Sequence, residues 1–187
     1  MKLWKTKDTL EDNSIGLSRD VTARIIPELD AHLASLFTLF HQLQKHHWLV
    51  EGPQFGPLHE FLSEAYQEAH EHVDNIAERI TALGGIPTCN PVAQAEIACI
   101  EHEPEGVFRA RPMLSRDLEA FGVISQRLRK TITLAREHED YGTELLLKQI
   151  LLSIEDRAHH LEHFLGADSL TLGMDLESEI RRPRLAS

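Results

Sequence analysis

Cysteine, basic residues and long apolar runs are all scarce in this chain of 187 residues. Its two cysteines, Cys89 and Cys99, are ten positions apart, a spacing that fits neither a CxxC redox pair nor a zinc-ligand framework. We interpret them as reduced structural thiols. No run reaches the roughly 18 apolar residues of a membrane span, and the lysine-containing N-terminus lacks the apolar core of a signal peptide. We therefore expect a cytoplasmic protein without a membrane partner.

Basic residues are outnumbered by acidic ones. The chain has 19 Lys and Arg against 30 Asp and Glu, which gives a formal net charge of -11 with histidine neutral. Such a surface repels nucleic acid on average and attracts cations. A general DNA-binding surface is therefore excluded, and any DNA contact would have to come from a local basic segment.

Apolar residues recur every three or four positions along most of the chain, which is the period of amphipathic helices. No segment shows the alternation typical of a strand. Gly52-Pro53 is expected to end the first long helix and Gly84-Gly85 the second. The pattern predicts an all-α chain with long helices at 21–50, 57–83, 111–138 and 144–165, the last capped by Thr143, and one short helix within 92–100.

The connections predict how these helices are arranged. The first loop has only about six residues, so the first two long helices should form an antiparallel hairpin. The connection from 84 to 111 is longer than a hairpin needs and indicates a crossover along a four-helix bundle. We expect one domain at 19–166, with extensions at 1–18 and 167–187.

The second long helix carries a polar face of candidate metal ligands. His59, Ser63, His70, Asp74 and Glu78 are spaced by 4, 7, 4 and 4 residues, which places them on one side of a helix. His59 and Asp74 are nevertheless separated by about 22 Å along the axis, so one ion cannot bind both ends. Two antiparallel copies would bring His59 of each to Asp74 and Glu78 of the other, with His47 joining from across the loop. The alternative is an ordinary solvated face.

Two linked motifs resemble the signature of the Dps family, the mini-ferritins also called DNA-protecting proteins of starved cells. They cover about forty residues and read His47-Trp48-x-Val50-x-Gly52-x-x-Phe55-x-x-Leu58-His59 and Asp74-x-x-Ala77-Glu78-Arg79-Ile80-x-x-Leu83-Gly84-Gly85-x-Pro87. The resemblance implies a ferritin-like four-helix bundle with a short crossover helix, assembled as a twelve-subunit hollow shell. It also implies iron-oxidising centres between two-fold-related subunits, with His47 and His59 from one chain and Asp74 and Glu78 from the other.

One position departs from the family pattern. An aspartate usually follows the second histidine by four residues, and here that residue is Ser63, whose neutral hydroxyl is a poor ligand for a hard cation. We hypothesise that His70, or a member of the cluster His159, His160 and His163, adds a nitrogen ligand and makes the centre more favourable to zinc. The alternative is that these histidines are surface residues or hydrogen-bonded core residues.

The activity implied by the resemblance is oxidation of Fe(II) to Fe(III) by peroxide or O₂, followed by storage of the ferric mineral. The acidic turn around Asp140 and Glu144 corresponds to a family region at three-fold pores, where repeated carboxylates would draw in Fe(II). The alternative is a solvated turn that places acids at a helix N-terminus.

Some members of the family bind DNA through a lysine-rich tail. Here basic and acidic residues are mixed in both tails, so we predict weak or absent DNA binding. Two other functions stay open: a nucleoid-compacting structural protein, and a four-helix protein that binds zinc without turnover. The tail residues concerned are Lys2, Lys5 and Lys7 beside Asp8, Glu11 and Asp12, and Arg181, Arg182 and Arg184 after Asp175, Glu177 and Glu179.

Overall fold

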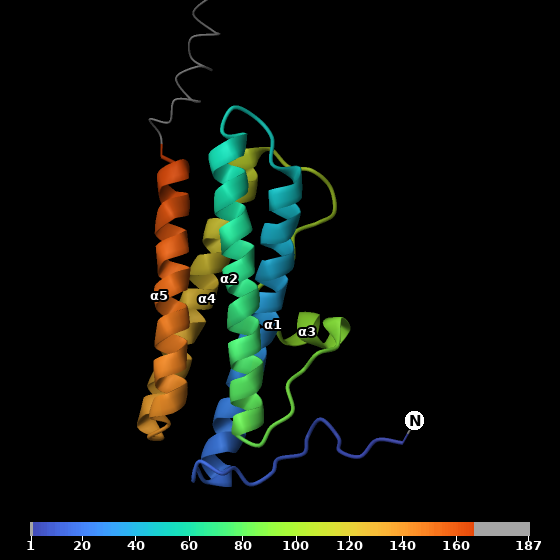
Figure 1. Cartoon of the computed structure of the whole chain (residues 1–187), viewed down its shortest axis with the longest axis vertical. Helices are drawn as coiled ribbons and strands as arrows, with labels where there is room; N and C mark the ends of the chain where they lie inside the picture. The colour runs from blue at the N-terminus through green and yellow to red at the C-terminus, as the bar shows by residue number, and fades with distance from the viewer. Residues whose placement is uncertain (1, 167–187) are drawn as a thin grey trace, which may run out of the picture.

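The computed structural model describes residues 2–166, which form five helices and, within that range, no strand (Figure 1). The all-α prediction is confirmed, and every helix bound lies within three residues of its expected position. None of the helices in the described range is both long and apolar enough to cross a membrane. The helices are α1 (Arg19–Leu49), α2 (Phe55–Ala82), α3 (Pro91–Ile97), α4 (Ala110–Glu137) and α5 (Tyr141–Phe164).

The four long helices pack side by side as a bundle, with α3 outside it against α1 (Figure 1). α1 packs along α2 and α4 along α5, and the two hairpins meet mainly through α1 and α4. The connection through α3 carries the chain back along the bundle, as the length of that segment predicts. Leucine and isoleucine dominate the core, including Leu29, Leu36 and Leu43 of α1, Leu62 and Ile76 of α2, Ile124 and Leu128 of α4, and Ile150 and Ile154 of α5.

The predicted N-cap of the last helix is wrong. The cap is Asp140, and α5 begins at Tyr141 rather than at Glu144. One carboxylate oxygen of Asp140 accepts the backbone N–H of Thr143 at 3.0 Å, and the other accepts its hydroxyl at 2.6 Å. Thr143 is buried and acts as a donor to the cap, because the charged aspartate is the stronger acceptor at a helix N-terminus.

A buried ionic network ties the crossover to the bundle. The His46 ring of α1 lies between two carboxylates, with Nδ1 2.7 Å from Asp117 of α4 and Nε2 2.8 Å from Glu103 of the connection. Lys45 adds an ion pair to Glu103 at 2.6 Å, and the Gln42 amide donates to Asp117 at 2.7 Å. Because each carboxylate has a cationic partner, burying this charge is tolerated.

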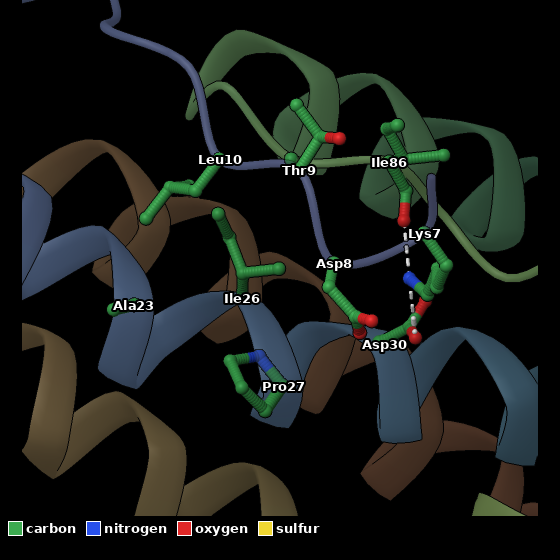
Figure 2. A pocket seen from close by; sticks show the side chains of 10 residues that line it. Lys7, Asp8, Thr9, Leu10, Ala23, Ile26, Pro27, Asp30 and Ile86 are labelled. Atoms are coloured by element: carbon green, nitrogen blue, oxygen red, sulfur yellow. Dashed lines mark hydrogen bonds and ion pairs between the residues drawn. The ribbon is translucent and has the colours of Figure 1, made fainter. Parts of the chain in front are cut away.

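The N-terminal segment packs on the bundle before α1 begins. The Lys7 ammonium donates to the carbonyl of Ile86 and forms an ion pair with Asp30 of α1 at 2.9 Å (Figure 2). Further along, the backbone N–H of Glu11 donates to the carbonyl of Gly84 at 2.9 Å, and a Cβ at Gly84 would collide with the Glu11 carbonyl. A pocket of about 340 Å³ remains between this segment and α1. The predicted 167–187 extension, with its arginines, lies outside the described residues.

Candidate metal centre

His47 and His59 meet across the turn that joins α1 to α2. His47 lies in the last turn of α1, where backbone carbonyls lack partners within the helix, and His59 lies near the start of α2. Each ring places Nδ1 2.9 Å from the backbone carbonyl oxygen of the other histidine. The rings stack, with centroids 3.7 Å apart and an angle of 22° between their planes. The structure therefore brings the two sequence-predicted histidines of one chain into direct contact.

This reciprocal bonding determines what the two rings offer to a metal ion. A backbone carbonyl can only accept a hydrogen bond, so Nδ1 is the protonated nitrogen in each neutral ring. The lone pair then resides on Nε2, the nitrogen not engaged in the pair. A hydrogen bond that fixes the tautomer and orientation of an imidazole is the usual support for a metal-binding histidine. Both rings are half-buried, so they are held in place without being closed off.

The paired histidines belong to a longer row of aromatic rings that sequence reasoning missed. Phe55 stacks on His59 with centroids 4.8 Å apart, and Tyr66 lies edge-on to His47 at 5.3 Å. Tyr66 in turn contacts Phe40 at 5.9 Å. Rings recur seven residues apart at Phe40 and His47 and again at His59 and Tyr66, a pattern that is visible in the sequence. Their order across the two helices depends on the register of the hairpin. The row limits rotation of both imidazoles.

Asp74 and Glu78 lie further along α2 and are exposed. Because α2 runs without interruption from Phe55 to Ala82, the separation of about 22 Å between His59 and Asp74 applies. Neither carboxylate forms an ion pair within residues 2–166, and no group of three or more potential metal ligands gathers in that range. The described chain therefore holds two separated halves of the predicted ligand set.

The position of the missing aspartate is occupied by a hydroxyl with a partner. Ser63 accepts a hydrogen bond from the side chain of Gln67 at 3.0 Å, one turn further along α2. His70 is exposed and lies against Phe40, with ring centroids 5.1 Å apart. This contact places His70 at the end of the aromatic row nearest Asp74, on the face that the spacing predicts.

The helix-five histidines make contacts of their own. His160 donates through Nδ1 to the backbone carbonyl of Asp156, 2.8 Å away, and its ring lies 6.4 Å from that of Phe61. His163 and His159 approach each other with their Nε2 atoms 3.2 Å apart. Within the described residues, none of the three shares a hydrogen bond or ring stack with His47 or His59.

The two predicted pore carboxylates both have partners within the chain. Asp140 is buried, and besides capping α5 it forms an ion pair with Arg79 at 2.5 Å. Glu144 contacts Lys148 at 2.6 Å and Arg136 at 2.9 Å. Hydrogen bonds to Lys148 and Arg136 hold the pKa of the Glu144 carboxyl below its usual value, so it stays charged. Asp140 thus has a structural role here, and the pore role of both residues stays a prediction.

Comparison with known proteins agrees with this architecture. Residues 26–171 match the ferritin-like domain family. A nutrient stress-induced DNA-binding protein of Nostoc sp. is 44% identical over 162 residues, which covers 87% of this chain and 88% of that protein. A DNA protection during starvation protein of Halobacterium salinarum is 38% identical over 165 residues, or 88% of this chain and 91% of that protein. The crystal structure of an archaeal Dps homologue from that organism superimposes with a TM-score of 0.87 at 37% identity, covering 91% of this chain and 95% of that one.

Proposed function

The chain belongs to the Dps family of ferritin-like proteins, and from this premise we propose that it oxidises Fe(II) at centres shared by two copies of the chain. His47 and His59 of one copy bind the ion together with Asp74 and Glu78 of the other. The reciprocal hydrogen bonding of His47 and His59 is the observation that carries the proposal, because it leaves two metal-binding nitrogens without carboxylates in the same chain. A two-fold assembly supplies those carboxylates.

The four ligands have complementary tasks in this reaction. The two imidazoles hold Fe(II), while the two carboxylates stabilise the higher charge of Fe(III). Each Fe(II) gives up one electron, and a peroxide that accepts two electrons and two protons leaves as two water molecules. We propose that twelve chains enclose a cavity in which the ferric product is stored as mineral, so that iron and peroxide are removed together.

Steady-state iron oxidation tests this proposal. The rate of Fe(II) oxidation, with O₂ and then with peroxide, should fall at least about a hundredfold in His59→Ala and in Asp74→Asn, because each removes a direct metal ligand. His102→Ala is the control, since His102 is exposed on the crossover and its Nδ1 contacts only the carbonyl of Glu103. Equal rates in all four proteins would reject the centre, and rates no faster than without protein would favour the alternative of a metal-binding bundle without turnover.

We propose that His70 takes the place of the missing aspartate. It lies one turn before Asp74, on the exposed side of α2, and its ring rests on Phe40. A nitrogen ligand in this place makes the centre more suitable for Zn²⁺ than the usual carboxylate does. Titration of Fe(II) and Zn²⁺ into His70→Ala should show weaker binding of both, and unchanged affinities and stoichiometries would remove His70 from the centre.

For iron entry we propose the turn between α4 and α5, at three-fold axes of the shell. Glu144 is the better test residue, because replacement of Asp140 would also remove the cap of α5 and the ion pair with Arg79. Glu144→Gln should slow iron uptake into the cavity without changing oxidation by a pre-loaded centre. Equal uptake rates would remove Glu144 from the entry path.

DNA binding is the second candidate function, because the Nostoc relative carries that activity in its name. We propose that it is weak in this chain. Lys5 is paired with Glu11 at 2.6 Å and Lys7 with Asp30 at 2.9 Å, so two of the three N-terminal lysines already have anionic partners. A gel shift at increasing salt distinguishes the two functions, since a nucleoid-compacting protein binds at low salt and loses affinity steeply as salt rises.

A further inference from the structure

Two exposed histidines face each other on the last turns of α5. His159 and His163 are four residues apart, which places them one above the other on the same face of the helix. Their Nε2 atoms lie 3.2 Å apart, and their ring planes are inclined at 74° with centroids 4.5 Å apart. Two such nitrogens are both acceptors unless one carries a proton, so the pair has a place for one shared proton or one shared cation.

The separation of these nitrogens matches the spacing that a transition-metal ion imposes. With Zn–N bonds of about 2.0–2.1 Å, two neighbouring ligand nitrogens are about 3.3 Å apart in a tetrahedral complex and about 2.9 Å apart in an octahedral one. The observed 3.2 Å lies between these values. From this geometry we infer that His159 and His163 are the two nitrogen ligands of a site for a borderline divalent cation. Zn²⁺ is the ion that suits this site best.

The electrostatic setting of the pair also favours a cation. His163 lies in the last turn of α5, where the backbone carbonyls give the helix end a partial negative charge. Exposed acids on the same turns, Asp156 and Glu162, add to that field. The helix end and these acids thus favour a cation at the pair, and the guanidinium of Arg111, which donates to the carbonyl of Leu165 at 2.8 Å, offsets part of that field.

This site differs in chemistry from the iron centre proposed above. Its two ligands are both imidazoles, and within residues 2–166 no third histidine, cysteine, aspartate or glutamate completes a cluster with them. Neutral nitrogen ligands suit Zn²⁺, whereas Mg²⁺ and Ca²⁺ require oxygen ligands. A site with two protein ligands exchanges its ion readily, so it collects a metal ion instead of catalysing a reaction.

Zinc titration of the full-length assembled protein tests this inference. The parent protein carries His47→Ala, His59→Ala and His70→Ala, so that the proposed iron centre has lost all of its nitrogen ligands for Zn²⁺. Isothermal titration should show one Zn²⁺ per chain in this parent, with no competition from excess Mg²⁺. Adding His163→Ala should weaken that binding by more than the roughly 10–100-fold that loss of an outer-shell partner costs.

Two further variants make the result specific. His160→Ala is the matched control, because His160 neighbours His159 but is turned toward Phe61 and the Asp156 carbonyl. It should bind zinc like the parent. His163→Cys should restore binding, since a thiolate is also a zinc ligand. Equal zinc affinity in the parent and in His163→Ala, or loss of binding in His160→Ala alone, overturns the inference. Because the parent lacks His47 and His59, either result leaves the proposed iron centre untouched.

Discussion

Acid sensitivity of the bundle should depend on one buried histidine, His32 in the middle of α1. Its side chain is fully buried between α1 and α4, where Nε2 lies 2.8 Å from the hydroxyl of Thr131. Nδ1 has no hydrogen-bond partner among the described residues. Burial, with a smaller contribution from the nearby Arg127 guanidinium, lowers the pKa of His32 from 6.5 to about 3. The ring is therefore neutral in the folded chain at every pH near neutrality.

The difference between the pKa of His32 in the folded chain and in the unfolded chain sets how stability changes with pH. Between pH 6.5 and pH 3 the unfolded chain binds a proton at His32 that the folded chain does not, so stability falls as pH falls through this range. The slope is about 1.4 kcal/mol per pH unit, which amounts to about 2 kcal/mol between pH 6.5 and pH 5. Over the whole window the loss approaches about 5 kcal/mol.

Replacing the titrating ring with an apolar side chain of similar size isolates its contribution. Urea unfolding of the wild type and of His32→Met should be compared at several pH values from 7 to 5, at one protein concentration, because assembly also affects stability. As the pH falls over this range, the free energy of unfolding should decrease by about 2 kcal/mol less in the variant than in the wild type. His102→Ala, an exposed histidine, should follow the wild type. Identical pH dependence in His32→Met and the wild type would refute a neutral, buried His32.

Three other substitutions probe the crossover, the N-terminal segment and the iron centre. His46→Ala should destabilise the fold by about 3–5 kcal/mol in thermal unfolding, because it leaves the buried carboxylate of Asp117 without its cationic partner. A loss of stability below about 1 kcal/mol would contradict the ionic network. Asp30→Ala should release Lys7 and strengthen DNA binding at low salt in a gel shift, and an unchanged shift would mean that docking does not restrain the segment. Ser63→Asp should tighten Fe(II) binding at least about tenfold in equilibrium titration, since it supplies a carboxylate to a hard cation. Equal Fe(II) affinity in the variant and the wild type would show that the side chain at position 63 does not reach the ion.

The helices could be predicted because buried apolar residues recur along them every three or four positions. Leu36, Leu43 and the other core residues of α1 recur at the helical period, and one glycine-proline pair follows the end of α1 while another lies in the first turn of α2. The cap of α5 was not predicted correctly. Asp140 and Thr143 are both good caps by residue type, and only the contacts of Asp140 with Thr143 and Arg79 distinguish them.

The residues of the candidate site could be predicted from the sequence, but the hydrogen bonds that hold them in place could not. Helical rise alone separates His59 from Asp74, and the unbroken α2 preserves that separation. The mutual hydrogen bonds of His47 and His59 depend on the backbone of the turn between them, which no periodicity describes. Docking of the N-terminal segment was likewise missed, because Lys7 meets Asp30 and Ile86 only after the bundle has formed.

Complementation between two defective chains tests the shared centre most directly. One chain carries His47→Ala and His59→Ala, and the other carries Asp74→Asn and Glu78→Gln. Each alone should be inactive in Fe(II) oxidation. When equal amounts assemble at random, about half of the two-fold pairs are mixed, and each mixed pair has one intact centre out of two, so about one quarter of wild-type activity should return. Co-assembled protein that remains as inactive as either variant alone would contradict an iron centre formed by two chains.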